Sequence, residues 1–570
     1  METKAVDLLL PGMELRETHI SWVFLGRDEA FKVKKPVSLG FLDFSTIEKR
    51  REACEAEVRL NRRLAPDVYR GVVPVIRDAF GRHRFGPDGN PVDWAVHMKR
   101  LPDSHRADVR LERGELTGED IELVAGRVAR FHHECGPSAV AESFGTVEAI
   151  RFNVLENFEQ TSSTIGQYLG ADRVKELEAW QLRFLEERRS LFEERLRSGR
   201  IRDGHGDLRL EHVYLGDRGE VTILDCIEFN ERFRFADVCA DVVFLAMDLA
   251  WHDRVDLAER FIARYAREAG DYDLYPLVDF YQSYRAFVRG KITSMTAGDE
   301  AASLKARDRA AAEARRYFLL ALASERQALV PAAVIAVGGV IASGKSTLAN
   351  ALGREMPAAV VDADRTRKQL AGVALDHPLP ESPFAGFYSP EFTRGVYSEL
   401  CRRASAVLAS GRPVILDASF RARAHRADAS ELAQANGVPF VFVECQAGDE
   451  LCRRASAVLA SGRPVILDAS FRARAHRVEA KRLARAHGMP FVFVECRAPD
   501  EICRERLRER EKKRTVSDGR IEVFDDFARS WEQVDELDPS EHVILDTSES
   551  VAANLEILAK TLPVAPGLTR

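Results

Sequence analysis

One stretch of the sequence restricts the fold of this chain more than any other. The apolar run Ala333–Val337 leads into G-V-I-A-S-G-K-S at Gly339–Ser346, and a helix-like segment, Thr347–Leu352, follows. Glycines at this spacing let consecutive backbone N–H groups turn inward around phosphate oxygens, and the start of a helix adds a partial positive charge. Strand, loop and helix together predict a P-loop that binds a nucleoside triphosphate.

The chemistry of this loop assigns its residues. Lys345 is expected to reach the β- and γ-phosphates and the Ser346 hydroxyl to hold Mg²⁺, so ATP and Mg²⁺ are the predicted cofactors. The residues expected to bind the cofactor here are Gly339, Ala342, Ser343, Gly344, Lys345, Ser346 and Thr347. The alternative is a glycine turn that carries Lys-Ser by chance, and the flanking strand and helix disfavour it.

Length and charge narrow the class of protein. A chain of 570 residues is long enough for two or more domains. Its net charge of −7 provides no positive surface for nonspecific nucleic-acid binding. The N-terminus lacks the basic start and apolar core of a signal peptide, and no apolar run reaches the length of a membrane span. We therefore expect a cytoplasmic protein that does not bind a membrane. The acidic balance disfavours nucleic acid as a partner, with a nucleic-acid end kinase as the open alternative, and the oligomeric state is left open.

The second half of the chain alternates between strand-like and helix-like segments. Strands are expected at Val360–Asp364, Val414–Asp417, Phe440–Glu444, Val465–Asp468, Phe491–Glu495 and Val543–Asp546. This alternation predicts an α/β P-loop domain over 332–562, with a parallel, doubly wound sheet.

A long internal repeat lies within this domain. Glu399–Arg426 recurs unchanged 51 residues later as Glu450–Arg477, and similarity continues over two copies, 399–449 and 450–500. Each copy has the pattern helix–strand–helix–strand. Two copies are too few for a solenoid, so we interpret the repeat as a recent tandem duplication.

The repeat gives the sheet two surplus strands. We expect Val414–Asp417 and Phe491–Glu495 to hold the original strand positions, because the first copy follows the natural upstream helix and the second leads into the natural downstream helix. Val414–Asp417 is an apolar strand that ends in a carboxylate, so Asp417 is a candidate to hold the Mg²⁺ shell through water. Its duplicate, Asp468, competes for the same role.

Another carboxylate, Asp364, ends an expected strand. A carboxylate at the C-terminal end of a parallel strand points toward the region where ligands of such sheets bind. Asp364 is therefore a candidate to accept the proton of an acceptor hydroxyl, and Arg367, one turn into the next helix, to steer a phosphate or carboxylate. A helix-capping Asp followed by a solvated Arg explains these residues equally well.

The segment Cys503–Arg514 is a strongly cationic helix. Its arginines Arg506 and Arg510 are candidates for a lid over the transferring phosphoryl group, and a solvated charged face is the alternative. Together, G-x-x-x-x-G-K-S, D-x-x-R, V-I-L-D and this helix resemble the P-loop kinases of the gluconate-kinase, polynucleotide-kinase and zeta-toxin type. The resemblance implies ATP-dependent transfer to a hydroxyl group, with Asp364 as the general base and Arg506 and Arg510 in the lid.

The first half, 1–328, has a different pattern. The expected elements are strands at Ile20–Leu25 and Ala30–Lys34, a helix at Thr46–Leu64, a strand at Trp94–Met98 and mainly helices from about Glu119. A small sheet followed by a helical lobe belongs to the α+β class.

Two acidic motifs mark this half. His205–His212 has the sequence H-G-D-L-R-L-E-H, and an apolar strand, Val221–Asp225, follows and ends in an aspartate. This resembles the aminoglycoside-phosphotransferase family, whose H-G-D-x-x-x-x-N and following I-D pair it matches with His212 in place of Asn. Asp237–Asp241 is similar to the D-x-x-x-D brace beneath the active-site loop of that family.

The resemblance implies a protein-kinase-like fold and a set of roles. Asp207 is implied to be the catalytic base, and Asp225 and His212 are implied to be the Mg²⁺ ligands. Lys34 is implied to contact the α- and β-phosphates, with Glu57 on the next helix as its ion-pair partner. The run Thr18–Leu249 is similar to a subgroup that is commonly fused to such a P-loop kinase.

Three functions stay open on the sequence. The first is a bifunctional enzyme, both of whose domains phosphorylate hydroxylated small molecules. The second is a single active P-loop kinase whose first domain is a nucleotide- or metabolite-binding regulator. The third is a scaffold or pseudoenzyme in which the duplication has destroyed the second site. We favour a Mg²⁺- and ATP-dependent phosphotransferase whose small-molecule acceptor the sequence does not specify.

Overall fold

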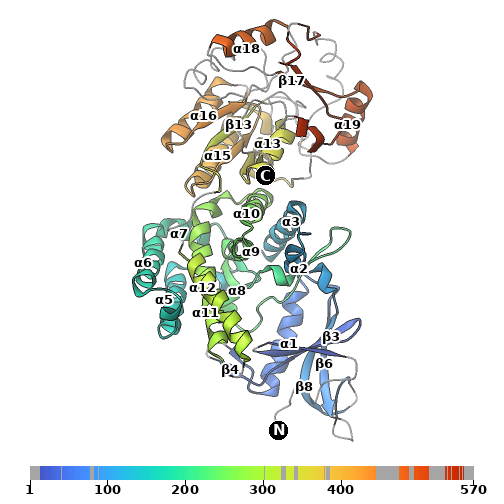
Figure 1. Ribbon diagram of the computed structural model, residues 1–570, viewed down its shortest axis with the longest axis vertical. Coiled ribbons are helices and arrows are strands. Elements are labelled where there is room, and N and C mark those ends of the chain that lie inside the picture. Colours follow the sequence, from blue (N-terminus) through green and yellow to red (C-terminus); the bar gives the residue numbers. More distant parts are fainter. Residues whose placement is uncertain are drawn as a thin grey trace. The chain divides into compact units, whose positions relative to one another are not determined.

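The computed structural model divides the chain into two compact units, Met1–Leu329 and Val330–Arg570 (Figure 1). It describes residues 13–18, 20–39, 42–77, 82–87, 89–300, 302–322, 329–338, 345–375, 377, 379, 386–420, 422–443, 474–486, 493–512, 533–535, 537–540, 542–550, 552–554 and 556–557. Within these residues, no helix is both long enough and apolar enough to cross a membrane.

The first unit begins with an antiparallel sheet. Its strands pair in the order β1–β2–β3–β8–β6–β7. They are β1 (Glu14–Glu17), β2 (Ser21–Leu25), β3 (Glu29–Lys34), β6 (Tyr69–Arg77), β7 (His83–Phe85) and β8 (Pro91–Lys99), and a separate short pair joins β4 (Ser38–Leu39) to β5 (Leu42–Asp43). The predicted hairpin and the predicted strand around Trp94 are confirmed.

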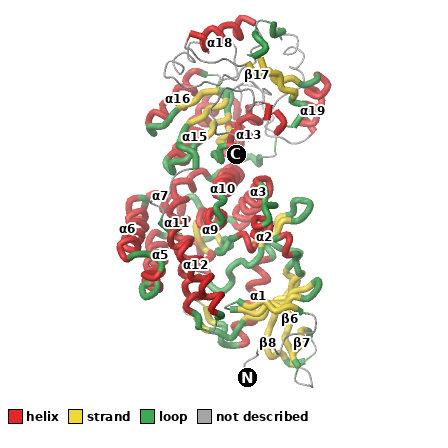
Figure 2. The backbone as a smooth tube through the Cα atoms, in the orientation of Figure 1, coloured by secondary structure: helices red, strands yellow, loops and turns green. Residues whose placement is uncertain are grey.

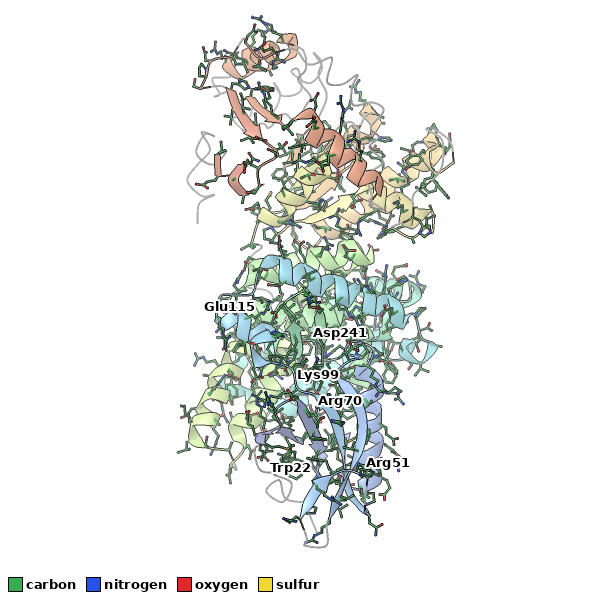
Figure 3. All side chains as sticks on the ribbon, turned by 90° about the vertical axis from the view of Figure 1, so that its right-hand side faces the viewer. Trp22, Arg51, Arg70, Lys99, Glu115 and Asp241 are labelled. Carbon is green, nitrogen blue, oxygen red and sulfur yellow. The ribbon has the colours of Figure 1, made fainter. Side chains whose placement is uncertain are left out.

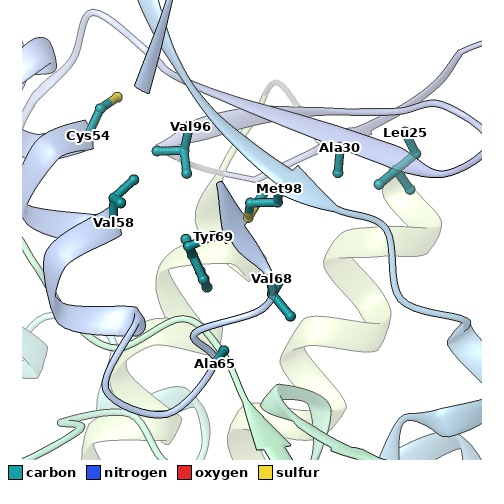
Figure 4. Packing of buried hydrophobic residues seen from close by; sticks show 9 residues of the cluster. All are labelled: Leu25, Ala30, Cys54, Val58, Ala65, Val68, Tyr69, Val96 and Met98. Atoms are coloured by element: carbon teal, nitrogen blue, oxygen red, sulfur yellow. The ribbon is translucent and has the colours of Figure 1, made fainter. Parts of the chain in front are cut away.

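One helix, α1 (Ile47–Asn61), packs against strands β8 and β6 of this sheet. Thr46 caps the helix by accepting a hydrogen bond from the Lys49 backbone N–H. The core between helix and sheet (Figure 4) consists of Leu25, Ala30, Cys54, Val58, Ala65, Val68, Tyr69, Val96 and Met98. Because side chains alternate along a strand, the face of β3 that carries Ala30 toward this core also carries residues 32 and 34.

Helices make up most of the rest of the first unit (Figure 2). They are α2 (Ala107–Glu112), α3 (Gly118–Cys135), α4 (Ala139–Glu142), α5 (Val147–Thr161), α6 (Ala171–Glu187), α7 (Arg189–Arg197), α8 (Glu231–Arg234), α9 (Val238–Trp251), α10 (Val255–Ala269), α11 (Val278–Gly298) and α12 (Leu304–Leu320). Every residue of α9 from Val238 to Leu249 is buried, and α10 and α11 pack against this helix. The small sheet and helical lobe confirm the kinase-like α+β fold.

Short antiparallel strands frame the acidic motifs of this unit. They are β9 (Ile201–Asp203) paired with β12 (Phe235–Asp237), and β10 (Val213–Leu215) paired with β11 (Val221–Ile223). The loop after β9 carries Asp207 and leads into a 3-10 turn, Leu210–His212. The segment after β11 carries Asp225, so the two strand pairs bring both aspartates into one region.

The second unit is built on a parallel sheet of four strands in the order β14–β15–β13–β16. Its strands are β13 (Val334–Val337), β14 (Ala359–Asp362), β15 (Val414–Asp417) and β16 (Phe440–Val443), and its helices here are α13 (Lys345–Glu355), α14 (Ala363–Leu370), α15 (Pro390–Leu408) and α16 (Arg423–Ala435). All residues of β13, β14 and β15 are buried, which is typical of parallel strands covered on both faces. The predicted parallel, doubly wound sheet is confirmed.

The two copies of the repeat occupy different places. β16, from the first copy, lies beside β13, whose other edge is taken by β15. The strand of the second copy, β17 (Phe493–Arg497), pairs instead with β18 (His542–Asp546), and the helices around it in sequence are α18 (Arg474–Ala486) and α19 (Asp500–Lys512). The prediction that Phe491–Glu495 holds the original position in the main sheet is therefore wrong, because the first copy already fills the free edge of β13.

Candidate nucleotide sites

A buried carboxylate fixes the H-G-D loop of the first unit. Asp241, which is labelled in Figure 3, lies near the start of α9. It accepts hydrogen bonds from the backbone N–H groups of His205 (2.5 Å) and Gly206 (2.9 Å). Gly206 has φ +87°, and a Cβ there would lie 2.9 Å from the Phe233 carbonyl oxygen, so this position requires glycine. The brace that the sequence implies is thus confirmed for Asp241.

Asp207 itself is held by one arginine. Arg209 donates from Nε to Asp207 Oδ1 and from Nη2 to Asp207 Oδ2, both at 3.0 Å. Burial would raise the pKa of the Asp207 carboxyl, but Arg209 and His212 outweigh burial and hold that pKa well below its ordinary value. The carboxylate is therefore ionised at neutral pH, and a hydroxyl that approaches it shares its oxygens with Arg209.

The histidine of the same loop is neutral. Burial first, and then the neighbouring His212, lower the pKa of His205 from 6.5 to about 4. His205 Nε2 lies 2.8 Å from the Leu224 carbonyl oxygen, and its Nδ1 lies 3.3 Å from the Asp207 backbone nitrogen. These partners assign the proton to Nε2 and leave Nδ1 to accept. The ring therefore links the Asp207 loop to the segment that carries Asp225.

His212 and Asp225, the two predicted metal ligands, lie close together. His212 Nε2 is 3.7 Å from Asp225 Oδ2, while His212 Nδ1 is 2.7 Å from the Asp207 carbonyl oxygen. Asp225 has φ +65°, which is uncommon for a residue with a Cβ and is frequent at functional sites. Burial would raise the pKa of Asp225, but Lys32 and His212 hold it below its ordinary value. Asp225 is therefore a carboxylate at neutral pH.

These donor atoms suit Mg²⁺ unequally. The Asp225 side chain is 46% exposed, and its carboxylate oxygens are the ligand type that Mg²⁺ prefers. The imidazole nitrogen of His212 is a poorer ligand for this hard cation. No group of three or more His, Cys, Asp or Glu side chains in the described part of the chain is arranged to hold a metal by itself. Asp225 fits a Mg²⁺ ion that takes its other ligands from water and phosphates, and His212 fits a hydrogen-bonding role.

Two lysines of β3 approach this site and differ in exposure. Lys34, the predicted phosphate ligand, has no exposed side-chain surface, and its Nζ contacts the carboxylates of Glu57 and Glu228. Lys32 Nζ lies 2.5 Å from Asp225 Oδ1 and 3.0 Å from Glu57 Oε1, with 12% of its side chain exposed. The predicted ion pair between Lys34 and Glu57 is present, but Lys32 is the lysine that faces the accessible carboxylate.

Sequence reasoning missed Lys32 and Glu228. A usable signal existed for Lys32, because residues 32 and 34 of a strand share one face, here the face covered by α1. Glu228 gave no comparable signal, since it lies in an irregular segment 194 residues from Lys34. Its contact with β3 arises from tertiary packing alone.

The second unit brings its candidate carboxylates to one edge of its parallel sheet. In the sheet register Asp417 aligns with the last residue of β13 and with Asp362 of β14. The ends of these strands place both carboxylates at the edge where the P-loop leaves β13. α13 begins at Lys345, and Ser346 and Thr347 follow in its first turn.

Part of the predicted site lies outside the described residues. Gly339, Ala342, Ser343 and Gly344 of the P-loop and Asp468 of the second copy belong to this part. Arg510 lies on α19, and its side chain is not described. Arg506, on the same helix, is exposed and donates from Nη2 to the Thr547 carbonyl oxygen at 2.5 Å. Arg506 therefore contacts the chain directly after β18.

The strand before α14 is shorter than predicted. β14 ends at Asp362, whose side chain caps α14 by accepting a hydrogen bond from the Arg365 backbone N–H at 2.7 Å. The prediction that this strand extends to Asp364 is therefore wrong. Because Asp362 is the capping residue, Asp364 lies in the first turn of the helix.

Arg367 is buried and contacts other residues of the second unit. Its Nη1 donates to the Phe387 carbonyl oxygen at 2.5 Å, and its guanidinium lies 4.7 Å from the centre of the Tyr388 ring. Burial raises the pKa of the Tyr397 phenol, while Arg367 lowers it and Asp364 raises it. The helix that carries Asp364 and Arg367, α14, packs against α15, which carries Tyr397.

Relatives cover most of the chain. The uncharacterised proteins Rv2004c of Mycobacterium tuberculosis (strain H37Rv) and Mb2027c of Mycobacterium bovis are each 34% identical to it over 437 residues, which is 77% of this chain and 84% of theirs. The chain belongs to their family. The family described as an AAA domain matches residues 334–458 and 453–534, and both matches lie in the second unit.

Several solved kinase structures are similar to the chain over about half of its length. An ethanolamine kinase of Plasmodium vivax has a TM-score of 0.34 at 10% identity and covers 54% of this chain and 82% of its own. Amicoumacin kinase hAmiN has a TM-score of 0.32 at 12% identity and covers 54% and 89%. Choline kinase LicA of Streptococcus pneumoniae has a TM-score of 0.30 at 10% identity and covers 54% and 94%.

The two units thus combine an aminoglycoside-phosphotransferase-like kinase fold with a P-loop domain, as predicted. Both kinds of fold occur among phosphotransferases. Neither fold specifies the acceptor or which unit is active.

Proposed function

We propose that the chain is an ATP- and Mg²⁺-dependent phosphotransferase that moves the γ-phosphate of ATP to a hydroxyl group of a small molecule. One observation carries the proposal: Lys32, Glu57 and Asp225 meet beside the loop that carries Asp207. A cation for phosphate oxygens, a carboxylate for the metal and a carboxylate for the acceptor hydroxyl are the parts that phosphoryl transfer requires. The P-loop motif supports a second nucleotide site in the other unit.

In the first unit we assign phosphate contact to Lys32 rather than Lys34. Lys34 is buried between Glu57 and Glu228, and moving it to a nucleotide would leave the buried Glu228 without this cation and Glu57 with Lys32 alone. Lys32 has only to release Asp225, which is exposed to solvent. Asp225 would hold Mg²⁺, which supplies neutralisation of charge at the phosphates.

Asp207 is assigned to the acceptor. Its ionised carboxylate accepts a hydrogen bond from the acceptor hydroxyl and takes the proton as the new oxygen–phosphorus bond forms and the bond to the departing ADP oxygen breaks. Arg209 fixes the orientation of this carboxylate through both oxygens. The neutral ring of His205 holds the Asp207 backbone nitrogen in place.

We assign roles to residues of the second unit in the same way, supported by the P-loop motif and by the alignment of Asp417 with the end of β13. Its residues are Lys345 and Ser346 for the phosphates and Mg²⁺, Asp417 for the Mg²⁺ shell, Asp364 for the acceptor proton, and Arg506 and Arg510 for the lid. Arg367 is assigned to holding the turn before α15, because its Nη1 is already bonded there.

A second candidate function is that the first unit binds nucleotide and regulates the second without catalysis. One observation favours it: Arg209 holds both oxygens of Asp207, and His212 offers nitrogen where Mg²⁺ prefers oxygen. Both functions require nucleotide binding, and they differ only in turnover by the first unit.

Titration calorimetry of the full-length protein tests the proposal. With Mg²⁺ and a non-hydrolysable ATP analogue we expect two binding events per chain, of which Lys32→Met removes one and Lys345→Ala the other. Lys49→Met, at an exposed lysine of α1, is the matched control and leaves both. No heat from the wild-type protein contradicts the proposal. If Lys345→Ala alone abolishes acceptor-dependent ATP turnover, the first unit is a regulator.

A further inference from the structure

The repeat presents the second unit with two chemically identical candidates for its Mg²⁺ ligand. Asp417 and Asp468 occupy the same position in identical stretches, Glu399–Arg426 and Glu450–Arg477. The sequence inside the repeat therefore cannot distinguish them. A distinction has to come from contacts with residues outside the repeat.

The turn after Asp417 is strained and buried. Phe420 has φ +46°, which is costly for a residue with a Cβ, and only 1% of its surface is exposed. Its Cβ lies 3.3 Å from where a Cβ would stand at Gly338, at the point where β13 passes into the P-loop. A strained residue persists only where its surroundings fix it from several sides. The contacts of this turn therefore determine how Asp417 is held.

Tyr397 provides one of these contacts from outside the repeat. It lies on α15, and its hydroxyl accepts a hydrogen bond from the Phe420 backbone N–H at 2.8 Å. The same hydroxyl lies 3.1 Å from Ser419 Oγ, and the ring stacks on His425 with 3.6 Å between centroids. Arg426 donates to the Phe420 carbonyl oxygen at 2.6 Å. Both polar backbone groups of the strained residue are thus bonded.

The second copy has different surroundings. The residue 51 positions after Tyr397 is Gly448, which has no side chain that offers a hydroxyl. The matching arginines also differ: Arg426 bonds the Phe420 carbonyl, whereas its counterpart Arg477 is buried and donates from Nη2 to the Gln533 carbonyl oxygen at 3.1 Å. The same sequence is therefore held by different partners in the two copies.

We propose that Tyr397 is a positioning residue. By fixing the turn after Asp417, it makes Asp417 of the first copy, rather than Asp468 of the second, the Mg²⁺ ligand of the second unit. This inference rests on the nucleotide function proposed above for that unit. Asp417 aligns with the end of β13, and Tyr397 fixes the turn behind it against Gly338, so Asp417 is held beside the end of the strand that precedes the P-loop motif in sequence. α14, which carries the candidate base Asp364, packs against α15, which carries Tyr397.

Calorimetry with a non-hydrolysable ATP analogue tests the assignment in full-length protein that carries Lys32→Met, where the second unit alone is expected to bind nucleotide. Tyr397→Phe keeps the ring and its stacking on His425 but removes the acceptor for the Phe420 N–H. We expect affinity in Mg²⁺ to fall about tenfold, through the loss of one buried hydrogen bond, and affinity in EDTA to stay unchanged. Tyr388→Phe, at the other tyrosine of this unit, is the matched control and leaves both affinities unchanged.

The outcomes separate this inference from the function on which it rests. Unchanged Mg²⁺-dependent affinity in Tyr397→Phe overturns the role of Tyr397. If that variant does not fold, Asp417→Asn and Asp468→Asn decide: loss of Mg²⁺-dependent affinity in Asp417→Asn supports the first copy, and a loss confined to Asp468→Asn, or absent from both, overturns it. Binding that survives Lys345→Ala in the same background refutes the nucleotide function of the unit itself.

Discussion

The two candidate nucleotide sites are assembled in opposite ways. In the first unit, charged side chains from a strand, a helix and a distant loop neutralise one another. Lys32 on β3 pairs both with Glu57 on α1 and with Asp225, which is 193 residues from Lys32 in the sequence. In the second unit, Asp362 and Asp417 end adjacent parallel strands at the edge where the P-loop begins. The first site depends on tertiary ion pairs, and the second depends on strand order and a local motif.

This difference determines how each site responds to substitution. Where buried charges neutralise one another, removal of one leaves its partner uncompensated, so the site is coupled to stability. Of the two carboxylates at strand ends, Asp362 also caps α14 and is therefore coupled to stability, whereas we expect Asp417 to affect mainly ligand binding. Variants should therefore separate stability from catalysis differently in the two units.

The largest expected effect compares the two proposed bases. Asp207→Asn and Asp364→Asn each remove a proton acceptor at nearly constant size, so we expect transfer by the affected unit to slow by about 10²–10⁴-fold with nucleotide affinity unchanged. ADP formation with a panel of hydroxylated metabolites measures the rate. Asp217→Asn, at a side chain that is 86% exposed, is the control. A substitution that leaves its rate unchanged shows that the unit does not use that base.

The next effect compares the two lysines of β3. Lys34→Met removes the cation that the buried Glu228 contacts and leaves Glu57 with Lys32 alone, and we expect the free energy of unfolding to fall by about 3–5 kcal/mol. Lys32→Met should cost clearly less, because Asp225 is exposed to water and Glu57 keeps Lys34. Urea titration followed by circular dichroism measures both. Equal losses would contradict the division between a structural lysine and a phosphate-binding lysine.

A smaller effect is the pH dependence of the first unit. His205 titrates near 6.5 in the unfolded chain and at about 4 in the folded unit. Between these values the unfolded chain binds a proton that the folded unit refuses, so acidification from pH 7 to pH 4 should lower the free energy of unfolding by up to about 3 kcal/mol. Urea titrations at successive pH values measure the slope. His205→Gln should flatten it, and an unaltered slope in that variant rules out His205 as the source.

The smallest effect is expected on α19 of the second unit. Arg506 is exposed, so Arg506→Ala should change the free energy of unfolding by less than about 0.5 kcal/mol. As a lid residue it should nevertheless slow transfer by that unit. Thermal unfolding and ADP formation, measured on one preparation, distinguish the two effects. A variant with normal stability and normal turnover would remove Arg506 from the proposed lid.

The outline of both units was predictable because local patterns encode it. The sequence predicts a hairpin of Ile20–Leu25 and Ala30–Lys34, and the structure has it at Ser21–Leu25 and Glu29–Lys34. The P-loop motif predicts a strand before it and a helix from Thr347, and the observed helix begins at Lys345. The H-G-D motif likewise indicates a loop that a buried carboxylate, Asp241, holds in place. In each case the relevant contacts lie within a few residues or within a recognisable motif.

The remaining features depend on contacts between distant residues. No local pattern links Glu228 to Lys34, because that pair forms only when the irregular segment after β11 meets β3. The choice of Asp362 over Asp364 as the cap of α14 is a difference of half a helical turn, which propensity does not resolve. The repeat is the extreme case, since identical sequences occupy different positions and only their surroundings distinguish them.

The buried contact between Lys34 and Glu228 has a mechanical consequence. It joins the sheet to the segment that follows Asp225, and both side chains are almost entirely inaccessible, at 0% and 4% exposed. If the first unit binds a nucleotide as proposed, we expect its entry and exit to require the sheet and the helical lobe to move relative to one another. Separating Lys34 from Glu228 would leave the buried Glu228 without its cation, so we expect the motion to be a rotation with its hinge near Lys34. The far end of the sheet then travels furthest.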